Sequence, residues 1–167
     1  MKPAQRVAPD KGGKEVKEMA RIEASVVINR PVEEVFEFVT NPKNDLLWQS
    51  GVLESEQTSE GPMGVGTTLR SVSQLMGRRM EGPGEVIGYE ANKKITYKFA
   101  SGPMSGEYSY TFEPVEGGTR LSFVGEGETG GFLKHLFGLA DSIFVRMAQR
   151  GMETDLANLK DILEAEA

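Results

Sequence analysis

The sequence predicts an α+β domain in which one long C-terminal helix covers the apolar face of an antiparallel sheet. Two observations support this fold class. Six short strand-like segments follow one another between residues 52 and 126, which is typical of an antiparallel meander. Residues 131–166 then form an amphipathic stretch with apolar side chains at helical spacing. This stretch carries the only long apolar stripe available to cover the sheet.

The composition is that of one globular domain. The chain has 167 residues, a net charge of −6 and no cysteine, which excludes disulfides, thiolate metal sites and thiol catalysis. The acidic balance, with no basic face, argues against nucleic acid as a partner. No segment approaches the length of a membrane span and we identify no signal peptide. We therefore expect a cytoplasmic monomer or homodimer with no integral membrane segment and no cofactor.

Residues 1–20 differ from the rest of the chain. They hold five basic against three acidic residues, and prolines together with the pair Gly12-Gly13 interrupt any helix before Lys14. We expect a flexible basic N-terminal extension, with the domain spanning residues 21–167. A short helix over residues 14–20 that docks on the domain is the alternative.

The first elements of the domain are predicted from alternation and helix signals. Alternating apolar residues predict a strand over 22–29. Pro31 suits the first turn of a helix, and Glu33 and Glu34 complement its N-terminal dipole. The helix is expected to end before Pro42, where proline prevents continuation.

A short helical turn over residues 43–48 contains the only tryptophan, Trp48. We interpret Trp48 as a core residue beneath one end of the sheet, with a place at a cavity mouth as the alternative. Turn residues then delimit strands, which we expect over residues 52–59, 67–76, 79–89, 94–100, 106–114 and 119–126.

The last three strands alternate apolar and polar residues, so one face of the sheet is expected to be buried and the other wet. Tyrosines on the buried face could donate protons to a substrate, or could pack with a satisfied hydroxyl. The aromatic residues that share this face, and that we expect to contact a ligand, are Tyr97, Phe99, Tyr108, Tyr110, Phe112 and Phe123.

The helical stripe has unusually little bulk at its centre. With Phe144 at the origin of a helical wheel, Met147 and Gly151 fall near the middle of the apolar side. Glycine costs a helix about 1 kcal/mol relative to alanine, so Gly151 suggests either room for a guest or close helix–sheet packing. We expect Phe144, Met147 and Gly151 to contact a ligand. The stripe rotates beyond Gly151, which predicts a bend there.

Catalytic residues cannot be assigned from the sequence. The single histidine, His135, is predicted to face away from the apolar stripe, and no metal-site spacing is present. Asp155 lies within the stripe and needs an explanation: a partner such as Arg70 or Arg120, exposure at the helix end, or a role as an acid or ligand anchor. Tyr110 and Asp155 are the weak catalytic candidates.

Residues 21–167 resemble the polyketide cyclase/dehydrase-type family of the START-like, birch-pollen-allergen-like (SRPBCC) superfamily. The segments that carry the resemblance are PVEEVF at 31–36, NP at 41–42 followed by Trp48, and EP at 113–114 followed by GGTRL at 117–121. The resemblance implies a helix-grip fold, with a curved antiparallel sheet of about seven strands around the C-terminal helix and two short helices between strands 1 and 2. It also implies an apolar cavity between sheet and helix. Members of the family bind hydrophobic small molecules, and some are cyclases or dehydrases.

Three hypotheses for the function follow. The first is binding or transport of a hydrophobic small molecule, such as a lipid, quinone or polyketide-like compound. The alternative is a cyclase/dehydrase-type enzyme that acts on an aromatic or polyketide-like substrate in the same cavity, which requires polar groups inside it. The third is an interaction or assembly factor that uses the basic N-terminal segment.

Overall fold

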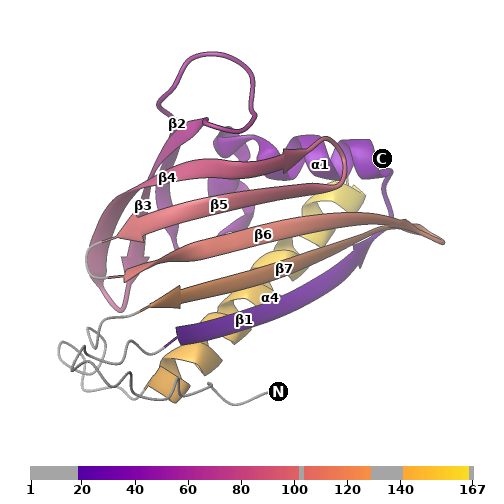
Figure 1. Cartoon of the computed structure of the whole chain (residues 1–167). Helices are drawn as coiled ribbons and strands as arrows, with labels where there is room; N and C mark the ends of the chain where they lie inside the picture. The colour runs from indigo at the N-terminus through magenta and orange to yellow at the C-terminus, as the bar shows by residue number, and fades with distance from the viewer. Residues whose placement is uncertain (1–18, 102–103, 129–140, 166–167) are drawn as a thin grey trace, which may run out of the picture.

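A seven-stranded antiparallel sheet and one long helix dominate the computed structural model, which describes residues 19–101, 104–128 and 141–165 (Figure 1). The elements in chain order are β1 (Met19–Ile28), α1 (Val32–Thr40), the 3-10 turn η1 (Pro42–Asn44), α2 (Asp45–Trp48), β2 (Val52–Gln57), β3 (Thr68–Leu75), β4 (Arg78–Glu90), β5 (Lys94–Ser101), β6 (Met104–Val115), β7 (Gly118–Glu128) and α4 (Asp141–Ala165).

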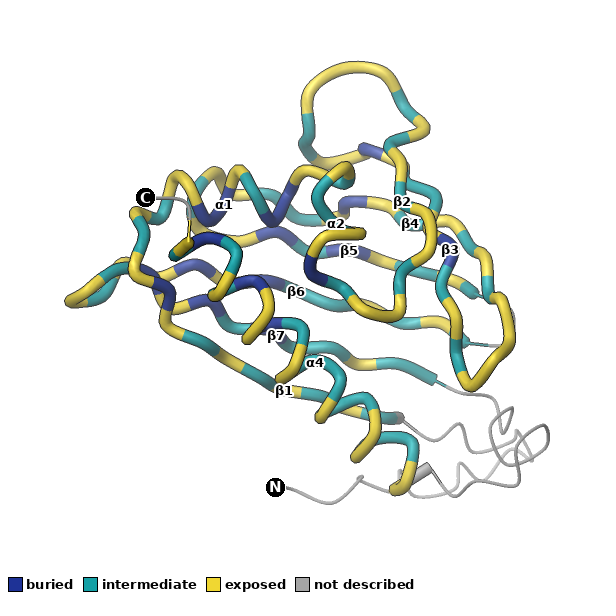
Figure 2. Tube along the Cα trace, turned by 180° about the vertical axis from the view of Figure 1, so that it is seen from behind, coloured by how far each residue is buried: buried dark blue, intermediate teal, exposed yellow. Residues whose placement is uncertain are grey.

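The strand order is β1-β7-β6-β5-β4-β3-β2, and every neighbouring pair is antiparallel. Strands β2 to β7 form the predicted meander. The segment α1–η1–α2 carries the chain from the β1 edge to the β2 edge, and α4 crosses one face of the sheet (Figures 1 and 2). This arrangement confirms the predicted helix-grip α+β fold.

Helix α1 forms where its capping residues predict it. Pro31 precedes the first turn, which contains Glu33 and Glu34. At the other end the hydroxyl of Thr40 donates to the carbonyl of Phe36 at 2.7 Å, and the chain leaves the helix before the proline that begins η1. These signals set both ends of α1, and its buried face packs against the sheet.

One end of the sheet and the second half of α4 enclose a filled core. Phe36 of α1 packs edge-on against Phe112 of β6, with ring centroids 4.9 Å apart. Trp48 is buried and packs edge-on against Tyr110, so it is the core residue that we predicted. The buried apolar residues of this core are Ile28, Val35, Phe36, Val39, Trp48, Val86, Ile95, Tyr97, Tyr110, Phe112, Leu121, Phe123, Leu156, Leu159 and Leu163.

Helix α4 runs without interruption through Gly151. The residues of α4 that face the cavity or the core run from Phe144 to Leu163 and share one face. On a helical wheel that advances 100° per residue, the centre of this face lies about 65° from Phe144. Met147 lies on the far side of Phe144 from that centre and is 45% exposed. A single inward face therefore accounts for the rotation of the stripe, which removes the reason for predicting a bend at Gly151. Residues 131–140, which include His135, lie outside the described residues.

Side chains of α4 also cover the free edge of β1. The ammonium group of Lys160 donates to the carbonyl of Val27 at 2.7 Å, and the amide of Asn29 donates to the carboxylate of Glu164 at 2.8 Å. The side-chain amide of Gln149 makes a further pair of hydrogen bonds with the strand backbone. Unpaired strand edges can recruit other strands, so these contacts protect the sheet and fix where α4 lies along it.

Candidate ligand-binding cavity

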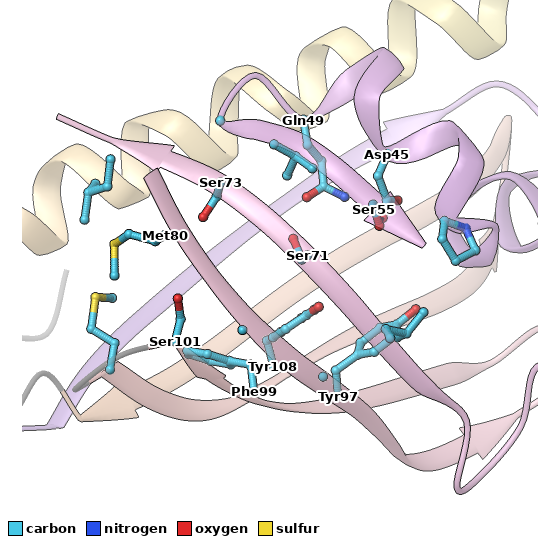
Figure 3. A pocket seen from close by; sticks show the side chains of 18 of the residues that line it. Asp45, Gln49, Ser55, Ser71, Ser73, Met80, Tyr97, Phe99, Ser101 and Tyr108 are labelled. Atoms are coloured by element: carbon cyan, nitrogen blue, oxygen red, sulfur yellow. The ribbon is translucent and has the colours of Figure 1, made fainter. Parts of the chain in front are cut away.

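A cavity of about 450 Å³ lies between the sheet and the first half of α4, with α2 and β2 along one side (Figure 3). Pockets for small ligands are typically about 300–1,000 Å³, so this one is large enough to hold a guest. Phe144, Ala148 and Met152 of α4 face it, whereas the leucines of the second half of α4 pack into the core. The helix therefore covers a cavity with one half and a filled core with the other.

One wall of the cavity is aromatic. Tyr97 of β5 and Tyr108 of β6 stack with centroids 4.8 Å apart and an interplanar angle of 21°. Phe99 lies 5.9 Å from Tyr108, and Tyr110 packs edge-on against both tyrosines. Strand alternation places these rings on one face. The wall therefore offers a ligand two kinds of contact, with the aromatic rings and with the phenolic hydroxyls.

The opposite wall is polar. Ser71 and Ser73 alternate on the cavity side of β3, and Ser55 of β2 lies beside Asp45 of α2 and Gln49, the residue after that helix (Figure 3). The same side of β3 begins and ends with leucines, so the polar patch occupies only its middle. The cavity is consequently apolar on one side and rich in hydrogen-bonding groups on the other.

Asp45 is the acidic group of this polar wall. It begins α2, where a carboxylate complements the helix N-terminus. The hydroxyl of Ser55 donates to its Oδ2 at 2.6 Å. Burial raises the pKa of Asp45 to about 6, and the hydrogen bond from Ser55 partly opposes that rise. At neutral pH the group is mainly an ionised hydrogen-bond acceptor.

The tyrosine hydroxyls remain protonated. Burial raises the pKa of Tyr97, Tyr108 and Tyr110, and the negative charge of Asp45 raises all three further. Within the described part of the chain none of the three hydroxyls has a hydrogen-bond partner. Each is therefore available to water or to a polar group of a ligand.

Asp155 lines the cavity but is engaged by the protein. Its Oδ1 accepts hydrogen bonds from the backbone amide of Ser50 at 3.1 Å and from the Ser50 hydroxyl at 2.8 Å. Neither predicted arginine is its partner. Arg70 pairs with Glu54 on the outer face of the sheet, and Arg120 pairs with an exposed glutamate. Asp155 thus ties α4 to the turn after α2.

The sequence-predicted ligand contacts divide into two groups. Five of them border the cavity: Tyr97, Phe99, Tyr108, Tyr110 and Phe144. The other four lie elsewhere: Phe112 and Phe123 are buried in the core, Met147 is exposed, and Gly151 is not among the lining residues. A side chain at Gly151 would meet nothing within 4 Å, so close packing does not explain this glycine.

The polar wall was missed by sequence reasoning. The sequence carries one local signal for it, because Ser71 and Ser73 share strand parity with Leu69 and Leu75, which places all four side chains on one face. Asp45 carries no such signal, since an aspartate at the start of a short helix is common for local reasons.

No group of three or more acidic or histidine side chains in the described part of the chain is arranged to hold a metal ion. None of the helices within those ranges is long and apolar enough to span a bilayer.

Solved structures with the same fold share little sequence with this chain. TTHA0849 from Thermus thermophilus superposes with a TM-score of 0.70 at 20% identity, covering 88% of this chain and 99% of that one. Protein SA2116 of unknown function from Staphylococcus aureus gives 0.69 at 15% identity, covering 89% and 96%. Ara h 8.0201 gives 0.64 at 13% identity, covering 89% and 99%. These similarities show the fold.

No curated protein matches the sequence. The family model described as polyketide cyclase/dehydrase and lipid transport matches residues 19–164, which is nearly all of the described domain. The match confirms the family that the sequence motifs indicated. The chain therefore belongs to the polyketide cyclase/dehydrase and lipid transport family.

Proposed function

We propose that this protein binds or transports a hydrophobic small molecule, such as a lipid, quinone or polyketide-like compound, in the cavity beneath α4. The observation that carries the proposal is the cavity itself, which is about 450 Å³ and bordered by aromatic side chains of two strands and by Phe144. Transferring apolar ligand surface from water to such a wall supplies the binding free energy. Family membership supports the same function.

Titration with 1-methoxypyrene, an uncharged fluorescent aromatic probe, tests this proposal by fluorescence anisotropy. Ala148 faces the cavity, whereas the adjacent Met147 is exposed, so phenylalanine at each position forms a matched pair. We expect saturable binding by the wild type and by Met147→Phe. We expect at least tenfold weaker binding by Ala148→Phe, because its ring occupies the cavity. Absence of saturable binding to the wild type would contradict the proposal, as would equal losses in both variants.

A second candidate is cyclase/dehydrase-type turnover in the same cavity. One observation favours it: Asp45, with a pKa of about 6, lies across the cavity from the neutral phenols of Tyr97 and Tyr108. Groups with separated pKa values can act as base and acid near neutral pH.

Dehydration of 4-hydroxy-4-phenylbutan-2-one tests this candidate, because loss of water produces a conjugated ketone that is followed by ultraviolet absorbance. If the protein is such an enzyme, Asp45→Asn should lower the rate at least tenfold and Met147→Phe should leave it unchanged. A rate equal to that of buffer would count against dehydratase activity on this substrate class.

A further inference from the structure

The two walls of the cavity differ in chemistry. On one side lie stacked aromatic rings, and on the other lie Asp45, Gln49 and three serines (Figure 3). A ligand that is apolar throughout would leave this polar wall without partners, and a buried polar group without a partner is costly. The occupant that satisfies both walls is amphipathic across its width.

The polar wall has fewer hydrogen-bond donors than the carboxylate of Asp45 can accept. Asp45 receives one hydrogen bond, from Ser55 to Oδ2, and no described residue donates to its other oxygen. An ionised carboxylate only accepts hydrogen bonds and has room for several. Hydroxyl groups of Ser71 and Ser73 also border the cavity, without side-chain hydrogen bonds in the described ranges.

Asp155, the other carboxylate that lines the cavity, does not share this deficit. The backbone amide and hydroxyl of Ser50 both donate to it. No lysine or arginine lines the cavity in the described part of the chain, so no protein cation neutralises Asp45 from within it. The missing donor for Asp45 is therefore one that a ligand can supply.

Resting on the proposed function, we propose that the cavity selects planar aromatic molecules with a hydroxyl donor at one edge. In this arrangement the ring system packs against Tyr108 and Phe99 while the hydroxyl donates to Asp45. A carbonyl or ether at the same edge would place an acceptor against an acceptor, so it is disfavoured at neutral pH. Asp45 is then the specificity-determining residue, and it recognises the hydroxyl groups of phenols and polyphenols.

The test compares 1-hydroxypyrene with 1-methoxypyrene, which differ at one edge, by fluorescence anisotropy at pH 7.5. We expect the wild type to bind 1-hydroxypyrene about tenfold more tightly, the value of one hydrogen bond to a charged group. Asp45→Asn should reduce this preference to within about twofold, since a charged acceptor becomes a neutral one. Asp161→Asn removes an exposed carboxylate of α4 by the same chemical change and should leave the preference intact.

A pH series on the wild type provides a second readout that needs no variant. Because the pKa of Asp45 is about 6, the preference for 1-hydroxypyrene should decline as the pH falls from 7.5 to 5. Among the residues that the structure describes, the other titratable groups that line the cavity are Tyr97, Tyr108, Tyr110 and Asp155. The tyrosines have raised pKa values and stay neutral throughout this range.

The outcomes separate this inference from the proposed function. Tight binding of both probes without a preference, or an equal loss of both in Asp45→Asn, would overturn the assignment of Asp45 and leave the binding function standing. Failure of both probes to bind the wild type would overturn both. If Asp45→Asn does not fold, the pH series decides, because a preference that stays constant from pH 7.5 to 5 contradicts the assignment.

Discussion

Asp45, to which we assign the selection of ligands, carries a cost in stability because it is largely buried. Burial raises its pKa from 3.8 to about 6, so at pH 7 the folded protein holds a charge that the unfolded chain holds more easily. Between about pH 4 and 6 the folded state therefore binds more protons than the unfolded state. The Asp45 contribution therefore destabilises the fold above pH 6 and disappears as the pH falls towards 4.

We expect Asp45→Asn to raise the free energy of unfolding by about 1–2 kcal/mol at pH 7.5. The whole shift in the pKa of Asp45 corresponds to roughly 3 kcal/mol, and the gain is smaller because the variant also weakens the hydrogen bond from Ser55. The difference from wild type should shrink as the pH approaches 4.5. Urea denaturation of both proteins at the two pH values measures it. A variant less stable than wild type at pH 7.5 would show that Asp45 stabilises the fold.

Two glycines of β4 that border the cavity provide a matched test of backbone packing. A Cβ at Gly82 would collide with the backbone carbonyl of Ala100, whereas a Cβ at Gly84 would meet only ordinary contacts, the nearest at 3.7 Å. We expect Gly82→Ala to destabilise the protein by about 2 kcal/mol or more, because the sheet must shift, and Gly84→Ala to be neutral within about 0.5 kcal/mol. Thermal denaturation distinguishes them, and equal midpoints would contradict the close approach at Gly82.

At the scale of elements, α4 was predictable as a helix but not in its orientation. Helical spacing identified residues 131–166, and the structure describes α4 from Asp141 to Ala165. The helical wheel placed Met147 near the middle of the apolar side. In the structure Met147 and Ile143 are exposed, whereas Leu159 and Leu163 are buried. Apolar residues occur on more than one side of this helix. Its local pattern cannot decide which side the sheet covers, because that depends on packing against distant strands.

The hydrogen bonds between Asp155 and Ser50 make a second element-scale point, since they join α4 to the turn after α2. We expect Asp155→Ala and Ser50→Ala each to destabilise the protein, with a coupling energy of about 1 kcal/mol in a double-mutant cycle. Denaturant unfolding of the four proteins supplies the cycle. Pairing Ser50→Ala with Asp161→Ala is the control and should be additive. Additivity in the Asp155 cycle would mean that the two side chains do not interact.

For the whole molecule, the meander and its aromatic face were predictable because strand alternation and turn residues are local signals. These signals alone are sufficient to place Tyr97, Phe99 and Tyr108 together on one face. The polar wall depends instead on packing between distant parts of the chain, which brings Asp45 of α2 and Ser71 of β3 opposite those rings (Figure 3). Long-range geometry of this kind leaves little trace in local sequence pattern, so half of the candidate site emerged only from the structure.

The division of the molecule into a filled end and a hollow end has a consequence for dynamics. The second half of α4 buries Leu156, Leu159 and Leu163 in the core, whereas the first half rests on the cavity. Amides near few packed side chains open more readily. We therefore expect hydrogen–deuterium exchange by mass spectrometry to be faster in peptides from residues 141–152 than in those from 156–165.

Ligand binding should change hydrogen exchange in the first half of α4 but not in the second half. A ligand that binds only the folded state stabilises the regions it contacts, so 1-methoxypyrene should slow exchange in residues 141–152 and leave 156–165 nearly unchanged. Ala148→Phe, with its cavity occupied, should show slow exchange in 141–152 without the probe and no further change when the probe is added. Probe-dependent slowing centred on residues 156–165 would contradict the division, because it would place the ligand in the filled core.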